Sequence, residues 1–200
     1  MRLFYSTSSP FARMVRIALI EKAVPSVEPV LVNPWQDAPD LIRANPSCRV
    51  PALVLDDGTA LSESQMIIAW MDREYPQPPL YNTAALALAG IAVGAIEAAA
   101  AIIIGRRATD AGFDTSAVGL RRRRSIVTAL DTLEAQAAAL ERPDPDLAVI
   151  ATVTLVDYLH FRFGGAEWMP QIARLDALSQ RLRARPSFAE TMPTEMPAQP

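Results

Sequence analysis

The sequence predicts a small α/β domain followed by an all-helical domain. Strand-like and helix-like segments alternate up to Tyr75, and beyond it every long segment has helical periodicity. A Pro-Gln-Pro-Pro run begins at Pro76 and separates the two regions, because prolines interrupt helices and favour an extended linker. The expected boundaries are residues 1–76 for the first domain, 77–82 for the linker and 83–200 for the second domain.

The first domain is expected to follow the order β-α-β-α-β-β-α. Apolar and β-branched runs predict its strands, helical spacing predicts its helices, and Asp56-Asp57-Gly58 predicts a hairpin turn. This order favours a small mixed sheet with helices on its faces. The expected strands span 2–5, 27–32, 51–55 and 59–61, and the expected helices span 10–22, 37–44 and 63–74.

The second domain is expected to contain four helices and an irregular tail. Apolar residues recur at helical spacing in each segment. The tail from Pro186 holds four prolines and is expected to wrap the surface without regular structure. The expected helices span 83–106, 116–140, 147–163 and 170–183.

Composition indicates a globular protein of the reducing cytoplasm. Half of the 200 residues are apolar, and a net charge of −3 gives no general attraction to nucleic acid. The run from Arg121 to Arg124 is interpreted as a solvated helix turn, since no aromatic residues interleave with it. One cysteine, Cys48, excludes an internal disulfide, and a single histidine, His160, disfavours a zinc site. We predict no metal site and interpret His160 as a packed or bridging residue.

The segment 84–104 is long and apolar enough to raise the question of a membrane span. It contains Gly90 and Gly94 in the Gly-x-x-x-Gly spacing of packed membrane helices. However, alanine drives insertion weakly, and Glu97 would cost about 2.5–3.5 kcal/mol at the bilayer centre. We therefore expect a buried helix of a soluble bundle or a dimer contact, and no membrane partner.

The junction between the first strand and the first helix carries the first candidate site. Ser9 stands where an N-cap belongs, and Pro10 stands where a first helical residue belongs. A helix start presents unpaired N–H groups and about +0.5 charge, so a hydroxyl there can hydrogen-bond to an anion such as a thiolate. The alternative from this segment alone is a serine that only caps the helix.

The second candidate segment is the strand start at Pro51. A cis Val50–Pro51 bond would present the Val50 backbone N–H and C=O to a peptide ligand, much as an added strand would bind. An ordinary trans proline at the start of a strand is the alternative.

The third candidate segment is a helix start at residues 62–65. Its hydroxyl groups suit a carboxylate, while Glu63 can accept a hydrogen bond from an ammonium group. A capping box between Ser62 and Gln65 is the alternative that needs no ligand. Together, the three segments would recognise a zwitterionic peptide whose thiol reaches Ser9.

Through these segments the chain resembles the glutathione transferase family over nearly its full length. The matching segments are 9–13 (SPFAR), 45–53 (NPSCRVPAL), 61–64 (LSES), 158–162 (YLHFR) and 185–191 (RPSFAET). The resemblance implies a thioredoxin-like first domain with Pro51 in the cis form, followed by a helical bundle of the glutathione transferase type. It also implies glutathione as co-substrate, a role in detoxification, and a cytoplasmic homodimer to which the helix from Ala84 contributes.

The resemblance assigns the catalytic role to Ser9, which matches the family's thiolate-stabilising serine. Ser8 is the alternative if the turn is shifted by one residue. The implied glutathione-binding residues are Ser9, Arg49, Val50, Pro51, Glu63 and Ser64.

Each binding residue would hold a different part of glutathione. The Val50 backbone would pair with the cysteinyl part. Glu63 and Ser64 would hold the γ-glutamyl end, and Arg49 would meet the glycyl carboxylate.

Two positions depart from the family's pattern. Cys48-Arg49 replaces the usual Gly-Lys before Val-Pro, so the loop has lost a flexible residue and gained a thiol. Val149 stands where many members have an aspartate that caps the core helix, and Asp146 is the candidate replacement cap.

The leading functional hypothesis is a transferase that joins the glutathione thiolate to small, largely apolar electrophiles held between the domains. One alternative is a glutathione-dependent thiol–disulfide or peroxide reductase acting through Cys48, which serine at position 9 disfavours. The other is a non-catalytic partner-binding protein of the same fold, which the intact Glu63-Ser64 pair disfavours. The sequence does not identify the electrophile.

Overall fold

The computed structural model describes residues 1–109 and 111–197. The chain forms two compact units, one of Met1–Tyr81 together with the chain from Ala184 onward, and one of Asn82–Arg183. Residues 184–197 therefore belong to the first unit, whereas the sequence analysis assigned them to the second domain.

The first unit contains the expected mixed sheet. Its strands are β1 (Arg2–Tyr5), β2 (Glu28–Leu31), β3 (Ala52–Val54) and β4 (Ala60–Ser62). They lie in the order β2-β1-β3-β4, with β1 and β2 parallel and the other neighbours antiparallel. The predicted hairpin turn joins β3 to β4, with Gly58 at a φ of 87°, a backbone conformation that suits glycine. This is the sheet of a thioredoxin-like domain.

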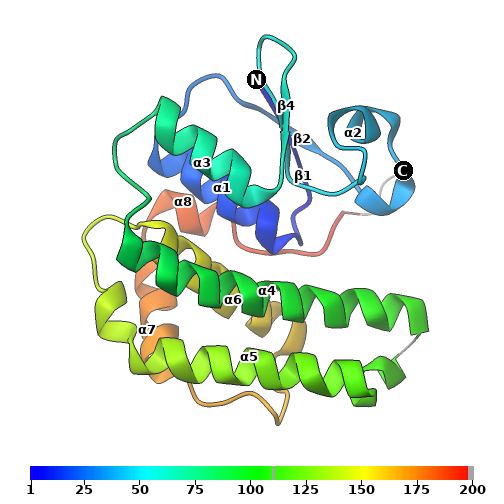
Figure 1. Ribbon diagram of the computed structural model, residues 1–200, viewed down its shortest axis with the longest axis vertical. Helices are drawn as coiled ribbons and strands as arrows, with labels where there is room; N and C mark the ends of the chain where they lie inside the picture. Colours follow the sequence, from blue (N-terminus) through cyan, green and yellow to red (C-terminus); the bar gives the residue numbers. More distant parts are fainter. Residues whose placement is uncertain (110, 198–200) are drawn as a thin grey trace. The chain divides into compact units, whose positions relative to one another are not determined.

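Helices cover both faces of this sheet. The helices α1 (Pro10–Glu21) and α3 (Ser64–Glu74) lie side by side on one face, and α2 (Pro39–Ala44) lies on the other (Figure 1). A short 3₁₀ helix, η1 (Pro34–Gln36), precedes α2. The core on the α2 side joins strand and helix residues, namely Phe4, Val32, Leu41, Ala44 and Ala52.

Helix α1 is buried more completely than its apolar spacing predicts. Buried positions occur all around it, including Arg13 at 2% exposure, and they include Val15, Ala18 and Leu19. Phe11, which shares their helical spacing, is only partly buried. A charged side chain inside this helix indicates a specific partner, which the C-terminal segment supplies.

The proline-rich linker is fixed to the first unit by Lys22, which ends α1. The Lys22 ammonium lies 2.6 Å from the Tyr75 carbonyl oxygen and 2.7 Å from the Pro78 carbonyl oxygen. It also forms an ion pair with Asp72 at 2.7 Å. A buried ammonium needs such partners, because an unpaired charge is costly to remove from water.

The second unit is helical throughout its regular structure. It contains α4 (Thr83–Thr109), η2 (Ala111–Thr115), α5 (Ala117–Ala135), η3 (Ala137–Leu140), α6 (Leu147–Phe163) and α7 (Ala173–Leu182). Helix α6 is buried along almost its whole length and contacts α4 and α7. Its cap is Asp146, whose carboxylate accepts from the Ala148 and Val149 N–H groups at 3.0 and 3.2 Å. The replacement cap predicted from the sequence is therefore confirmed.

Helix α4 meets the length and hydropathy criteria for a membrane span, with a mean hydropathy of 2.3 over its most apolar window. Half of that window is buried inside the protein, against α5 and α6. This packing supports the interpretation as a core helix of a bundle.

Charged side chains connect the helices of the second unit. Asp114 in η2 accepts from Arg106 of α4 at 2.6 and 2.7 Å and from Arg123 of α5 at 2.8 Å. The sequence predicted that the whole run from Arg121 to Arg124 is solvated. For Arg123 this prediction was wrong, because its guanidinium donates to Asp114. His160 bridges α6 to α7 through Asp176, with 2.7 Å between His160 Nε2 and a carboxylate oxygen, in line with the bridging interpretation.

The tail is more ordered than the sequence predicts. It contains the short helix α8 (Pro186–Ala189), which packs against α1, and its Phe188 side chain is completely buried. The expectation of irregular structure from Pro186 was wrong, because the prolines there allow a helix start at Pro186 and lie too far apart to prevent burial of the residues between them.

Candidate functional site

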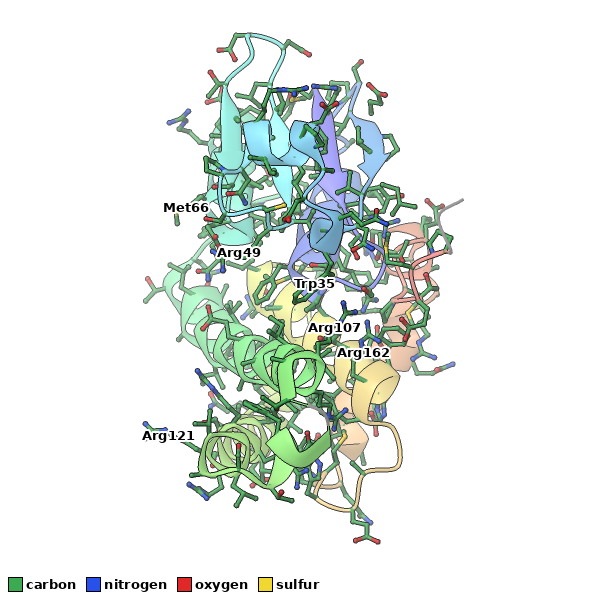
Figure 2. The ribbon with its side chains drawn as sticks, turned by 90° about the vertical axis from the view of Figure 1, so that its right-hand side faces the viewer. Trp35, Arg49, Met66, Arg107, Arg121 and Arg162 are labelled. Carbon is green, nitrogen blue, oxygen red and sulfur yellow. The ribbon has the colours of Figure 1, made fainter. Side chains whose placement is uncertain are left out.

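The three candidate segments meet at one edge of the sheet. β1 ends at Tyr5, β3 begins with Ala52 opposite Phe4, and β4 ends with Ser62 opposite Ala52. Because β3 is antiparallel to both neighbours, its start lies beside the ends of β1 and β4. The loop before α1, the loop before β3 and the start of α3 therefore share this edge. Figure 2 labels Arg49, which belongs to the second of these loops.

Ser9 occupies the N-cap of α1. Its backbone is extended, with φ −83° and ψ 119°, and its side-chain oxygen accepts from the Ala12 N–H at 3.2 Å. Pro10 is the first residue of the helix, as predicted. Since the Ser9 oxygen acts as an acceptor in the cap, its O–H remains available to donate to an anion.

Ser8 is engaged differently from Ser9. Its hydroxyl oxygen lies 3.2 Å from the hydroxyl oxygen of Ser6, and its N–H donates to the same Ser6 oxygen at 3.4 Å. Ser6 itself is buried, at 4% exposure. Of the two candidate serines, Ser9 is therefore the N-cap of α1, whereas Ser8 shares a hydrogen bond with Ser6 in which either hydroxyl can donate.

The Val50–Pro51 peptide bond is cis, as the family resemblance implied. The turn that leads to it is held by Asn45, whose amide donates to the Arg49 carbonyl oxygen at 2.8 Å. Among the described residues, the backbone N–H and C=O of Val50 have no hydrogen-bond partner. This pair is therefore open to a ligand that binds as an additional strand.

The start of α3 lacks a side-chain cap. Its N-cap is Glu63, with φ 64° and ψ 122°, and no side chain accepts from the first N–H groups of the helix. The capping box between Ser62 and Gln65 was therefore wrong as an alternative. Ser64 is buried at 4% exposure and stands at the first helical position. A positive φ in glutamate is rare and costs about 1–3 kcal/mol, which is typical of functional sites.

Arg49 and Glu63 connect the second segment to the third. Their side chains form an ion pair, with 2.5 Å between the guanidinium Nη2 and the carboxylate Oε1. The two side chains that the family resemblance assigns to different ends of glutathione thus contact one another.

Cys48 adopts the left-handed conformation, with φ 49°, at the position where the family pattern has glycine. Its thiol lies 3.5 Å from the Pro34 carbonyl oxygen. Desolvation and the neighbouring Asp37 carboxylate hold the pKa of the Cys48 thiol above its ordinary value. The thiolate form, which is the reactive one, is therefore disfavoured at this position.

Sequence reasoning missed Thr7 and Arg13, which attach the site to the C-terminal segment. Arg13 Nη2 donates to the Phe188 carbonyl oxygen at 3.4 Å, and the Thr7 hydroxyl lies 3.1 Å from the Thr194 carbonyl oxygen. A signal for Arg13 was present, because an arginine interrupts an otherwise apolar helix face. Its partners lie more than 170 residues away in the sequence, so no local pattern identifies them.

Comparison with known proteins identifies the family. The family described as glutathione S-transferase, N-terminal domain, matches residues 8–74, the part of the chain that holds all three candidate segments. A glutathione S-transferase from Methylobacterium radiotolerans, crystallised with glutathione sulfonate, is 34% identical and has a TM-score of 0.86. That similarity covers 100% of this chain and 97% of the relative. The chain belongs to the glutathione transferase family.

Two further glutathione transferase relatives extend over nearly the whole chain. A glutathione S-transferase from Methylobacillus flagellatus, with glutathione bound, is 28% identical with a TM-score of 0.85, over 96% of this chain and 99% of that one. The uncharacterized GST-like protein YibF of Escherichia coli is 29% identical over 96% of this chain and 98% of its own. The family assignment therefore applies to both units.

Within residues 1–109 and 111–197, no cluster of three His, Cys, Asp or Glu side chains has the arrangement of a metal site.

Proposed function

We propose that this protein is a glutathione transferase that joins the glutathione thiolate to small, largely apolar electrophiles. The observation that carries the proposal is the position of the Ser9 hydroxyl at the start of a 12-residue helix. It lies on the same sheet edge as the open Val50 backbone and the uncapped start of α3. The relatives crystallised with glutathione or glutathione sulfonate support glutathione as the thiol.

In this proposal each group of the site meets a complementary part of the tripeptide. The γ-glutamyl carboxylate accepts from Ser64 and from the first N–H groups of α3, and its ammonium donates to Glu63. The cysteinyl backbone pairs with Val50 beside Pro51. The glycyl carboxylate accepts from Arg49, which exchanges its bond to Glu63 for one to the ligand.

The chemical step needs a thiolate and an electrophilic carbon. Ser9 donates a hydrogen bond to the sulfur, and the positive end of α1 adds to the stabilisation, so the thiol pKa falls and its proton passes to solvent. The thiolate electron pair then forms the C–S bond. The electron pair displaced from carbon leaves with a departing group, or moves into an adjacent conjugated system. Ser9 acts by electrostatic stabilisation and positioning, without taking up a proton.

The direct test compares Ser9→Ala with Ser9→Thr in conjugation of glutathione to a chloronitrobenzene. Loss of one preorganised donor should lower kcat about a hundredfold, whereas the dissociation constant for glutathione should change only a few-fold. Ser9→Thr retains both the cap and the hydroxyl, so it should retain much of the activity. The double variant Ser8→Ala/Ser9→Ala removes both candidate hydroxyls, so Ser8 cannot replace Ser9 in it. Undiminished turnover in this double variant would overturn the role of Ser9.

We also propose a cytoplasmic homodimer with a part in detoxification, in which α4 contributes to the contact. Small residues are exposed along one face of α4 at Ala84, Ala87, Gly90 and Gly94, and this face continues to the charged Glu97. At either glycine, an added Cβ would have no atom of the described residues within 4 Å, apart from the neighbouring backbone of α4 itself. Such a stripe permits close approach of a second helix, as in other small-residue contacts.

Sedimentation equilibrium tests this assembly. The wild-type protein should have twice the 21.7 kDa mass of the chain. Gly94→Leu adds a side chain at an exposed position of α4 and should weaken the dimer, whereas Ala177→Leu, at an exposed position of α7, should not. A wild-type monomer at micromolar concentration would contradict the proposal.

A reductase acting through Cys48 is the second enzymatic candidate. The raised pKa of the thiol and serine at position 9 both disfavour it. Glutathione-dependent reduction of a disulfide or peroxide that disappears in Cys48→Ser would favour it over conjugation. A non-catalytic partner-binding role would be favoured if the protein bound no glutathione at all.

A further inference from the structure

The C-terminal segment runs along the helix that carries Ser9. We call residues 185–196 the strap. Figure 1 shows this red segment, which begins with α8 and then extends beside α1. At its beginning, the Arg185 guanidinium donates to the Glu21 carboxylate at 2.7 and 3.1 Å, near the end of α1. The strap therefore starts at the end of α1 that lies away from the candidate site.

The middle of the strap is fastened by buried groups. Arg13 Nη2 donates to the Phe188 carbonyl oxygen, and its Nε donates to the Thr191 hydroxyl, both at 3.4 Å. Thr191 is 1% exposed and donates in turn to the Ser187 carbonyl oxygen at 2.7 Å. Arg16 adds a bond to the Glu190 carbonyl oxygen at 3.0 Å. These contacts fix the strap one and two turns after the start of α1.

The far end of the strap reaches the loop that precedes Ser9. The Thr7 hydroxyl lies 3.1 Å from the Thr194 carbonyl oxygen and 3.3 Å from that of Glu195. In return, the Thr194 N–H donates to the Thr7 carbonyl oxygen at 3.3 Å. We call this reciprocal pair of contacts the clasp. It joins the strap to a residue two positions before the proposed catalytic serine.

A tight turn of the loop couples the position of Thr7 to the orientation of Ser9. The Ser9 N–H donates to the Ser6 carbonyl oxygen at 3.3 Å, so Thr7 lies inside a closed turn whose last residue is Ser9. The hydroxyl oxygen of Ser6 accepts from the Ser8 N–H at 3.4 Å. Displacement of Thr7 would therefore turn the peptide that carries Ser9, and with it the direction of the Ser9 O–H.

We propose that the strap positions Ser9 for thiolate stabilisation, and that Thr7 is the positioning residue through which it acts. The inference rests on the proposed function, in which Ser9 stabilises the glutathione thiolate. Thr7 itself touches neither thiol nor electrophile in this account. Its contribution is to hold the loop so that the hydroxyl at the helix start points at the incoming sulfur.

Three variants isolate the clasp. Thr7→Val keeps the side-chain shape and removes the hydroxyl, while Thr7→Ser restores it. A chain that ends at Pro193 removes the strap's half of the clasp but retains the buried Phe188 and Thr191. Thr59→Val is the matched control, since Thr59 is exposed at the β3–β4 turn, away from the edge that holds the candidate site.

Two measurements distinguish a strap that positions Ser9 from a strap that only stabilises the fold. The Ala12 N–H donates to the Ser9 side-chain oxygen, so the rate of amide hydrogen exchange at Ala12 reports how firmly the loop holds Ser9 in the free protein. The pH dependence of the bound thiol's ultraviolet absorbance reports the pKa of glutathione in the complex. With the clasp lost, we expect Ala12 exchange to become about three- to tenfold faster, the size expected for a single lost hydrogen bond. We expect the pKa of the bound thiol to rise by about 0.5, and Thr7→Ser to reverse both changes.

The clasp also predicts that the effects of Thr7→Val and of truncation after Pro193 are not additive. In the chain that ends at Pro193, Thr7→Val should have no further effect on either readout, because the partner of the hydroxyl is already gone. Full additivity of the two changes would show that they act independently and would overturn the inference.

The remaining outcomes are equally decisive. Faster Ala12 exchange with an unchanged thiol pKa would make the strap a structural brace only, which overturns the positioning role. Normal glutathione binding with both readouts unchanged would overturn the inference while leaving the proposed function intact. Failure of the wild-type protein to bind glutathione would instead remove the proposed function, and the positioning role with it.

Discussion

Arg49 and Glu63 form an ion pair between the loop before β3 and the start of α3. Their side chains are 67% and 57% exposed, so water screens the interaction, and such a pair contributes little to stability, about 1 kcal/mol or less. Its importance is for binding, because each partner is proposed to turn to a different end of glutathione.

Arg49→Ala should therefore weaken glutathione binding without unfolding the protein. Loss of a charge-assisted hydrogen bond to the glycyl carboxylate should raise the dissociation constant about tenfold, while the free energy of unfolding changes by about 1 kcal/mol or less. Isothermal titration and urea unfolding measure the two quantities. Arg73→Ala is the control, because its ion pair with Glu74 on α3 is also exposed to solvent. Equal affinities of Arg49→Ala and the wild type would contradict the assignment of Arg49.

The left-handed backbone at Cys48 predicts an unusual order of stabilities. Cys48→Gly should be more stable than Cys48→Ala by about 1 kcal/mol, because only glycine adopts a positive φ without cost. Comparison of the two variants cancels the loss of the thiol, which both share. Urea unfolding measures the difference. The same pair of substitutions at Ser47, whose φ is not positive, should give the reverse order.

The buried Phe188 predicts that the C-terminal segment stabilises the first unit. Phe188→Ala should lower the free energy of unfolding by about 3–5 kcal/mol, the usual cost of emptying a core site of this size. Trp35→Ala, at a side chain 55% exposed, should have a much smaller effect. Equal effects of the two substitutions in denaturant unfolding would contradict the packing of the tail.

Asp114 predicts a pH dependence of the second unit's stability. Hydrogen bonds and charge from Arg106, and then from Arg123, hold the pKa of Asp114 at about 2 in the folded protein. The unfolded value is near 3.9, so the stabilisation is fully present above about pH 4 and is lost as pH falls toward 2. The stability difference between wild type and Asp114→Asn should therefore narrow between pH 4 and pH 2. A difference that stays constant over that interval would show that Asp114 is not the titrating group.

Local sequence signals predicted much of the fold. Ser9-Pro10 predicts a helix start because a serine cap and a proline at the first position act within one turn, and Asp146 predicts its helix start for the same reason. The hairpin turn at Gly58 is equally local. These elements depend on residues a few positions apart, so the printed sequence contains what determines them.

The features that the sequence did not predict depend on contacts between distant residues. Arg13 is stabilised by a segment more than 170 residues away, and Phe188 becomes buried only when that segment lies on α1. At the start of α3, tertiary structure imposes a positive φ on Glu63, which prevents the capping box that the local pattern allows. In the site, the ion pair of Arg49 with Glu63 arises from strand pairing and could not be read from either segment alone.

The most direct test of the account is calorimetric titration of the protein with reduced glutathione, beside Ser64→Ala. Ser64 stands at the first position of α3 without a capping role, so its replacement should leave the fold intact and remove one donor to the γ-glutamyl carboxylate. We expect the wild type to bind glutathione and Ser64→Ala to bind it about tenfold or more weakly. Absence of binding up to millimolar glutathione, or equal binding by both proteins, would contradict it.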